Sequence, residues 1–264
     1  MTEKGLIVSG VGRRFPAKRG SVVAVTDADL ALRPGERLAL VGESGSGKST
    51  LVRMMLALDR PTTGTVTLDG TPVIPGSAHK LRWFRRRVQY IPQDPATSLN
   101  PHRRTVELVA EPLRLLGVDG DHRDRAEQAL DTVGLGGRFL DRRPTELSGG
   151  QNQRVAIARA VACAPDYLLA DEPASGLDVG LREQIIDVLH ALNATRSTAL
   201  MVVTHDLAVA ARLCEQIVVM FSGRLVECGS VADVLTRPTH PHTRDLIESI
   251  PRLPTPVGEP AVPR

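Results

Sequence analysis

A glycine-rich run between two segments of opposite character limits the folds open to this chain. The run reads G-E-S-G-S-G-K-S at 42–49, and it follows a strand-like segment at 38–41 and precedes a helix-like segment at 50–58. Glycines let the backbone wrap closely around a phosphate, so that N–H groups and a helix N-terminus face the negative charge. Because strand, glycine loop and helix occur in the required order, we expect a phosphate-binding loop rather than a chance match.

The side chains of this loop have distinct expected roles. Lys48 would reach the β- and γ-phosphates of a nucleotide, and the hydroxyl of Ser49 would ligate Mg²⁺. A dinucleotide-binding fold is the weaker alternative, because the spacing G-x-G-x-x-T at 45–50 lacks the third glycine that such folds use. The loop therefore predicts a nucleotide and Mg²⁺ as cofactors. The remaining residues of the cradle are Gly42, Glu43, Ser44, Gly45, Ser46, Gly47 and Thr50.

A second apolar segment ends in two carboxylates. The segment Y-L-L-A at 167–170 is followed by Asp171, Glu172 and Pro173. Strand ends are where α/β sheets bind their ligands. Beside a phosphate cradle, Asp171 is expected to hold Mg²⁺ directly or through water, and Glu172 to polarise the attacking water. Taken alone, a strand that simply ends in surface acids would be the simpler interpretation.

The motif L-S-G-G-Q at 147–151 stands just before an apolar-periodic stretch at 155–162, so we expect it to open a helix with Ser148 as the cap. With this motif the chain resembles the ATP-binding-cassette (ABC) ATPases, for which L-S-G-G-Q is the signature. The resemblance implies a head-to-tail dimer in which the signature of one subunit closes over the γ-phosphate held by the other. It implies that the cofactors are ATP and Mg²⁺, and it assigns nucleotide binding to Ser148, Gly149, Gly150 and Gln151.

Four further positions match the family's pattern one by one. Gln93 resembles the Q-loop glutamine that touches Mg²⁺ and the attacking water, and His205 resembles the switch histidine that contacts the γ-phosphate. Asp178, at the end of A-S-G-L-D, resembles the D-loop aspartate at the dimer seam. Phe15 resembles the aromatic that stacks on adenine, although a loop phenylalanine is just as often a core anchor. The resemblance implies catalytic roles for Glu172, His205, Lys48 and Gln93, and a metal site at Ser49, Gln93 and Asp171.

Apolar runs that alternate with helical patterns predict a parallel sheet covered on both faces. The runs lie at 37–41, 65–68, 88–91, 167–170, 199–203 and 217–220. We expect an α/β fold, a P-loop NTPase ABC cassette with a mixed, largely parallel core sheet, an N-terminal antiparallel β portion and a helical insertion. The expected units are the N-terminal core (1–94), a helical subdomain (95–147), the C-terminal core (148–229) and a proline-rich, partly disordered extension (230–264).

Composition excludes several classes of protein. Lys and Arg total 33 against 30 Asp and Glu, so the net charge of +3 does not demand nucleic acid as a partner. The three cysteines are far apart and form no C-x-x-C, which argues against disulfide, zinc and iron–sulfur frameworks and favours a reducing cytosol. We find no secretory signal and no run of about 18 apolar residues, so membrane contact is expected only through a partner. The basic stretch at 82–87 favours a solvated helix face over a phosphate-binding patch.

Two segments are similar to one branch of the family. Q-D-P at 93–95 with S-L-N-P at 98–101, and P-T-H-P-H-T-R at 238–244, resemble importer ATPases for oligopeptides, dipeptides and nickel. His242 stands where that branch usually has Tyr, and Asn152 and Gly176 are further departures, but none removes a phosphate ligand. This resemblance implies an ATP-hydrolysing subunit at the cytoplasmic face of the cell membrane that energises uptake of peptides or nickel.

The implied partners are integral-membrane permease subunits, a second ABC ATPase, identical or related, and indirectly an extracytoplasmic substrate-binding protein. Helices of the permease are expected to dock near Gln93, where Leu99, Trp83 and Phe84 could supply apolar contact. A soluble, non-transport ABC ATPase, such as a subunit of a phosphonate-metabolism complex, is the alternative. A DNA-repair ATPase would need a coiled-coil or zinc insertion, and a noncatalytic partner would have lost Glu172, His205 or a signature glycine.

Overall fold

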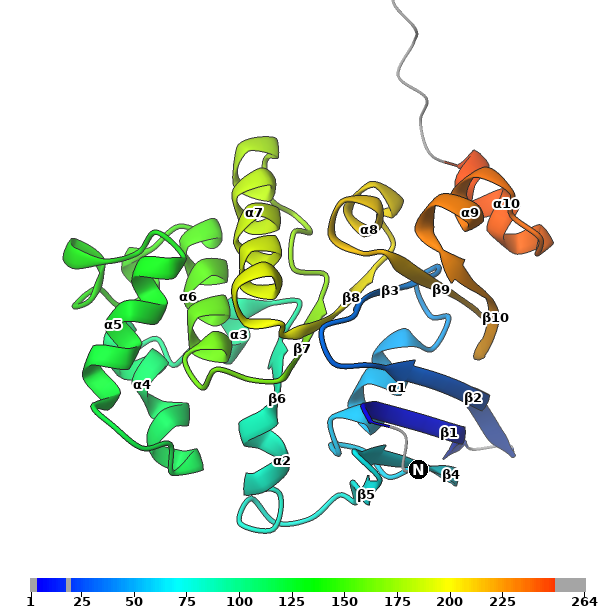
Figure 1. The fold of residues 1–264 in the computed structure, drawn as a ribbon, viewed down its shortest axis with the longest axis horizontal. Helices are drawn as coiled ribbons and strands as arrows, with labels where there is room; N and C mark the ends of the chain where they lie inside the picture. Colours follow the sequence, from blue (N-terminus) through cyan, green and yellow to red (C-terminus); the bar gives the residue numbers. More distant parts are fainter. Residues whose placement is uncertain (1–3, 18–19, 250–264) are drawn as a thin grey trace, which may run out of the picture.

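Two sheets and the helices that cover them make up the part of the chain that the computed structural model describes, residues 4–17 and 20–249 (Figure 1). The strands are β1 (Leu6–Pro16), β2 (Ser21–Leu32), β3 (Arg37–Val41), β4 (Thr63–Leu68), β5 (Thr71–Pro72), β6 (Val88–Ile91), β7 (Tyr167–Asp171), β8 (Ala199–Thr204), β9 (Gln216–Phe221) and β10 (Arg224–Ser230). The α-helices are α1 (Lys48–Met55), α2 (Arg82–Arg87), α3 (Pro95–Ser98), α4 (Thr105–Leu116), α5 (His122–Thr132), α6 (Gly149–Val161), α7 (Val179–Arg196), α8 (Leu207–Leu213), α9 (Val231–Thr236) and α10 (Pro241–Glu248). Short 3-10 turns lie at Gly137–Phe139 and Pro144–Glu146.

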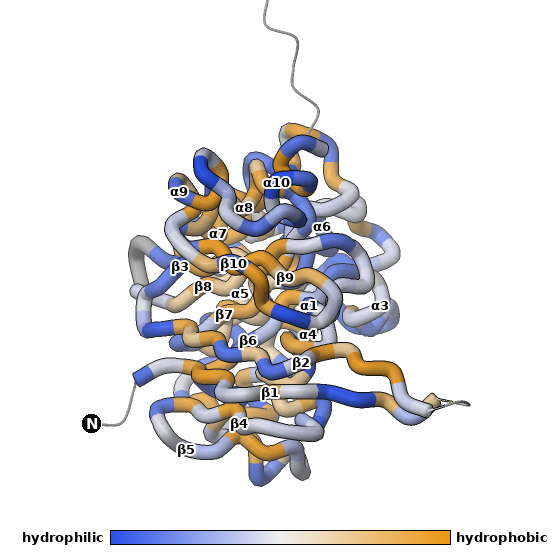
Figure 2. The backbone as a smooth tube through the Cα atoms, turned by 90° about the vertical axis from the view of Figure 1, so that its right-hand side faces the viewer, coloured by the Kyte–Doolittle hydropathy of each residue, from blue (hydrophilic) through white to orange (hydrophobic). Residues whose placement is uncertain are grey.

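The larger sheet has the strand order β10-β9-β3-β8-β7-β6. The strands from β9 to β6 run parallel, and β10 pairs antiparallel with β9. These strands are nearly continuous apolar runs, and β8 is buried at every position, because helices cover both faces of the sheet. Figure 2 shows hydrophobic colour concentrated along the strands of this sheet. The smaller sheet, β2-β1-β4-β5, is antiparallel.

Strand β3 shows how the sheet separates two cores. Leu38 and Leu40 face a core that also contains α1 and the antiparallel sheet, whereas Ala39 and Val41 face the core formed with the helices on the other side. This alternation follows from the period of two along a strand. Helix α1 therefore packs between the two sheets, and the loop that begins it lies at their junction.

The helices α4, α5 and α6 gather at one end of the core sheet (Figure 1). An apolar stripe on α4 and another on and after α5 are buried there. The predicted α/β class, with a parallel core sheet, an antiparallel N-terminal portion and a helical insertion, is confirmed. The buried stripes are Val106, Leu108, Val109, Leu113 and Leu116 on α4 and Ala126, Ala129, Leu130 and Val133 on and after α5.

Three local predictions need correction. The helix expected at 50–58 is α1, which spans Lys48–Met55 and begins where it does because Gly47, at φ 109°, has a left-handed backbone that cannot belong to the helix. Leu99 and Phe84 cannot supply exposed apolar contact, because they are 3% and 1% exposed and belong to the core, whereas Trp83 remains 38% exposed. Phe15 lies in strand β1 and not in a loop.

The basic stretch forms α2, with Arg82 and Arg86 exposed as predicted. Arg87 instead turns back to pair with Asp69 and Asp166. Across residues 4–17 and 20–249, no helix combines the length and apolar character that a membrane span requires. Helices α9 and α10 occupy much of the predicted C-terminal extension, and its proline-rich end, 251–264, lies outside the described residues.

Candidate active site

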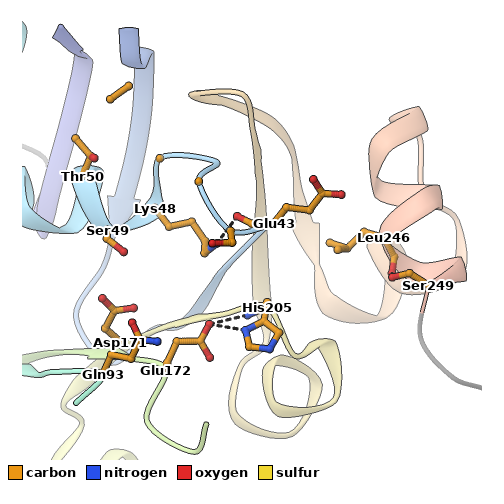
Figure 3. A pocket seen from close by; sticks show the side chains of 14 residues that line it. Glu43, Lys48, Ser49, Thr50, Gln93, Asp171, Glu172, His205, Leu246 and Ser249 are labelled. Atoms are coloured by element: carbon orange, nitrogen blue, oxygen red, sulfur yellow. Dashed lines mark hydrogen bonds and ion pairs between the residues drawn. The ribbon is translucent and has the colours of Figure 1, made fainter. Parts of the chain in front are cut away.

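A pocket of about 640 Å³ opens where the parallel strands end (Figure 3). The glycine loop follows β3, Gln93 follows β6, Asp171 ends β7 and His205 follows β8. Because these strands are neighbours in one parallel sheet, their carboxyl ends bring residues far apart in sequence to one edge. The lining residues are Ala24, Glu43, Ser44, Gly45, Gly47, Lys48, Ser49, Thr50, Gln93, Asp171, Glu172, His205, Leu246 and Ser249.

The glycine loop has a backbone that only glycine can adopt at Gly47. Its φ of 109° is in the left-handed region, and a Cβ there would lie 2.5 Å from the carbonyl oxygen of Ala24. The N–H of Gly223, in the turn between β9 and β10, donates to the Ser46 carbonyl at 2.8 Å and fixes the loop from behind. Of the predicted cradle, Gly42 and Ser46 do not line the pocket, whereas the other members do.

Lys48 is held at the centre of the loop. Its Nζ donates to the carbonyl oxygens of Gly42 at 2.7 Å and Glu43 at 2.8 Å, and the residue is 9% exposed. Burial lowers the pKa of Lys48, and the nearby carboxylates of Glu172 and Asp171 oppose that shift. The ammonium group is thus a buried positive charge next to the loop N–H groups, which suits binding of a phosphate.

Asp171 is a buried carboxylate, 6% exposed, at the end of β7. Burial raises its pKa, and a hydrogen bond donated by the Tyr90 hydroxyl to Oδ2 at 3.1 Å opposes the rise. Ser49, Gln93 and Asp171 line the same pocket with a hydroxyl, an amide and a carboxylate. Oxygen donors of these kinds are the ligands that Mg²⁺ prefers, so the donor set fits this ion.

Glu172 and His205 form a hydrogen-bonded pair in the pocket. His205 Nδ1 lies 2.7 Å from Glu172 Oε1, the His205 N–H donates to the same oxygen at 3.2 Å, and the Thr204 hydroxyl donates to Oε2 at 3.4 Å. Glu172 has a φ of 48°, which costs a non-glycine residue about 1–3 kcal/mol. These bonds, together with the one that the Glu172 N–H donates to the Val203 carbonyl at 2.8 Å, restrict the position of the carboxylate at the pocket.

The signature motif is confirmed as a helix start, outside this pocket. Ser148 caps α6: its Oγ accepts from the Gln151 N–H at 3.3 Å, and Gln151 Oε1 accepts from the Ser148 N–H at 2.9 Å. Ser148 and Gly149 are exposed, and Gly150 packs against the Leu181 side chain on α7. The helix N-terminus is therefore open to an anion supplied by another molecule.

Asp178 and Phe15 also lie away from the pocket lining. Asp178 is exposed and caps α7, with Oδ1 accepting from the Leu181 N–H at 2.9 Å. Phe15 is half-buried, and the guanidinium carbon of Arg13 stands 4.5 Å from its ring centroid. Their assignments to the dimer seam and to adenine stacking stay predictions.

Sequence reasoning missed the contribution of α10, whose residue Leu246, with the adjoining Ser249, lines the pocket. The ring of His242 stacks on Phe221 at 3.8 Å and fastens α10 to the end of β9. The segment 238–244 attracted notice as a family resemblance, but nothing in its pattern shows that it returns to the nucleotide loop. Ala24 on β2 is the other unpredicted lining residue.

The entry to α10 is also held by a carboxylate. Glu227 accepts hydrogen bonds from the Thr239 N–H at 2.7 Å and the His240 N–H at 3.0 Å. Burial alone would raise the pKa of Glu227, but these bonds outweigh it and lower the pKa to about 2. The anion therefore fixes the turn before α10 at neutral pH.

The sequence is similar to a family model and to ATP-binding proteins named for transport. Residues 25–175 match the family model described as ABC transporter. A putative peptide import ATP-binding protein of Brucella ovis is 39% identical over 254 residues, covering 95% of this chain and 80% of the relative. The oligopeptide transport ATP-binding protein OppF of Bacillus subtilis is 39% identical over 260 residues, covering 97% and 85%.

Solved structures are similar as well. The dimeric post-hydrolysis state of the ATP-binding cassette MJ0796, bound to ADP and Pi, superimposes with a TM-score of 0.79 at 32% identity, covering 86% of this chain and 98% of that one. A second dimeric structure of MJ0796, described as a bacterial ABC transporter cassette, has a TM-score of 0.78 at 33% identity, with the same coverage.

Proposed function

The chain belongs to the ABC transporter family, and from that premise we propose that it is the ATP-hydrolysing subunit of an importer that takes up peptides through a separate membrane permease. One observation carries the proposal. The similarity to a peptide import ATP-binding protein extends over 95% of the chain, and the pocket of this chain is lined by a lysine, a hydroxyl, an amide, two carboxylates and a histidine of the kinds that ATP hydrolysis requires. The names of these relatives favour peptides over nickel as the cargo and do not favour the phosphonate alternative.

The geometry of the pocket supports a role in ATP hydrolysis. The loop N–H groups and Lys48 would bind the phosphates, and Ser49, Gln93 and Asp171 would hold Mg²⁺. Bound there, the ion would neutralise charge on the β- and γ-phosphate oxygens. Glu172, held by His205 at 2.7 Å, would orient the attacking water and accept its proton. His205, exposed on the pocket side, would also reach the γ-phosphate.

A second cassette would complete the site. Ser148, Gly149 and Asp178 are exposed and lie away from the chain's own pocket, so they are free to meet the nucleotide of a partner. The α6 N-terminus would then close over the γ-phosphate, and ATP would join the two subunits until hydrolysis removes that group. Exposed signature residues suit a second copy of this chain and a related chain equally.

A groove beside the helical segment suits a helix of the permease. Its volume is about 600 Å³, and it lies between α2, β6, α4 and α6. Leu115 and Leu58 in its lining are 62% and 48% exposed, and Arg82 and Arg85 border them. An apolar floor with a basic rim would accept an amphipathic helix that carries acidic residues. Docking on a permease would keep the chain at the cytoplasmic face of the membrane, and the permease would meet the extracytoplasmic binding protein.

The test is to recover the partners. Tagged Glu172→Gln protein, purified from native membranes with Mg²⁺ and ATP, should bring a permease and a second cassette, identified by mass spectrometry. The same Glu172→Gln protein is then prepared with the further substitution Leu115→Asp, which places a charge in the groove. This second protein should no longer recover the permease but should still bind ATP. Recovery of soluble enzymes only would leave an ATPase but refute the importer.

A further inference from the structure

One side chain touches both the apolar groove and the nucleotide pocket. Tyr90, on β6, lines the groove, and its hydroxyl contacts Asp171 in the pocket. In the parallel register of β6 and β7, Tyr90 lies beside Leu169. Asp171 is two positions further along β7, so its side chain is on the same face of the sheet as that of Tyr90. The sheet register therefore brings the phenol to the carboxylate.

The contact has a defined chemical direction. A carboxylate only accepts hydrogen bonds, so the Tyr90 hydroxyl donates to Asp171 Oδ2 at 3.1 Å. Asp171 is 6% exposed, and Tyr90 packs against the core that contains α1. A phenol held by packing at its ring and by a carboxylate at its tip has little freedom to move. It therefore limits rotation of the Asp171 side chain.

We propose that Tyr90 is a positioning residue for Asp171: its hydroxyl holds Oδ2, leaves Oδ1 to a divalent cation, and ties the orientation of that carboxylate to the state of the groove. The inference deepens the proposed function and depends on its assignment of Asp171 to the Mg²⁺ site. Groups that orient a metal ligand from behind commonly contribute 10–100-fold to metal affinity. A helix bound in the groove would displace the ring of Tyr90. That displacement would move the hydroxyl that contacts Asp171, so the effect on Asp171 would not depend on Gln93.

The test measures nucleotide binding and not turnover. Affinity for a fluorescent, non-hydrolysable ATP analogue is titrated in EDTA and then with increasing Mg²⁺. Tyr90→Phe, which removes only the hydroxyl, should leave the Mg²⁺-free affinity unchanged and raise the half-saturating Mg²⁺ concentration about tenfold. Tyr167→Phe is the matched control, because Tyr167 is at the opposite end of β7 from Asp171. It should behave as the wild type.

The outcomes separate the two levels of the proposal. An unchanged half-saturating Mg²⁺ concentration in Tyr90→Phe, or an equal loss of affinity with and without Mg²⁺, would refute the positioning role and leave the importer proposal standing. A wild-type affinity that does not respond to Mg²⁺ would overturn the metal assignment itself. Failure to recover a permease would bear on the importer alone.

A double-mutant cycle tests the link to the groove. Leu115→Trp adds bulk to the groove lining and should shift the half-saturating Mg²⁺ concentration about threefold in the presence of Tyr90. The same substitution in the Tyr90→Phe background should have no such effect, because the connection to Asp171 is gone. Equal shifts in both backgrounds, or no shift in either, would refute the link.

Discussion

Replacing Glu172 by Gln separates the chemical role of this side chain from its structural role. The two side chains have the same shape, and Gln retains an oxygen that can accept from the His205 N–H, which now donates to Oε1 at 3.2 Å. The backbone strain at φ 48° is the same for both residues. What Gln cannot do is accept a proton from water. We therefore expect unchanged folding and ATP binding, with turnover about 100-fold lower, the scale of lost general-base assistance.

A 100-fold loss corresponds to about 2.7 kcal/mol in the activation free energy. The assay is release of phosphate under saturating Mg²⁺ and ATP, with ATP affinity measured separately and dimer formation followed by size-exclusion chromatography. The variant should accumulate as an ATP-bound dimer. Glu248→Gln, which removes one exposed charge between Leu246 and Ser249, is the control and should turn over normally. Wild-type turnover by Glu172→Gln would refute the assignment of the base.

Three more predictions rest on particular contacts. Lys48→Ala should lose nucleotide affinity measured by fluorescence titration, because it removes the buried ammonium of the loop; unchanged binding would contradict the phosphate cradle. Gly47→Ala should lower the melting temperature and weaken nucleotide binding, since its Cβ would meet the Ala24 carbonyl at 2.5 Å; a wild-type melting curve would refute the steric argument. The Glu227 carboxylate, with its pKa lowered from 4.5 to about 2, should stabilise the α10 region above pH 4.5 and lose that effect as the pH falls toward 2. Limited proteolysis should therefore cut near α10 faster at low pH in the wild type, whereas Glu227→Gln should be cut readily at every pH.

Much of the core sheet could be predicted from local pattern. The apolar runs at 37–41 and 88–91 coincide with β3 and β6, because strands buried on both faces in a parallel sheet must be apolar throughout. The start of α6 could be predicted from Ser148 and Gln151. These residues are three positions apart, and the side chain of each accepts a hydrogen bond from the backbone N–H of the other. Such features depend on residues that are close together in the chain, so they can be predicted from the sequence.

Burial of individual aromatic and aliphatic side chains was less predictable. Trp83 and Phe84 are adjacent on α2, yet one is 38% exposed and the other 1%. A helix turns about 100° per residue, so adjacent residues face different surroundings, and only the neighbouring elements decide which of them is covered. Leu99 follows α3, and its burial is decided by tertiary packing, since the core that covers it is built from segments before and after it.

The sequence by itself determined the phosphate loop, the paired carboxylates, the capped signature helix and the family to which the chain belongs, because each depends on residues close together in the chain. The tertiary structure alone decided that α10 returns to the pocket and that Tyr90 meets Asp171 across 81 positions of sequence. Contacts of that kind arise from the order and register of strands, which are set by the packing of the whole sheet and leave no mark in any short segment.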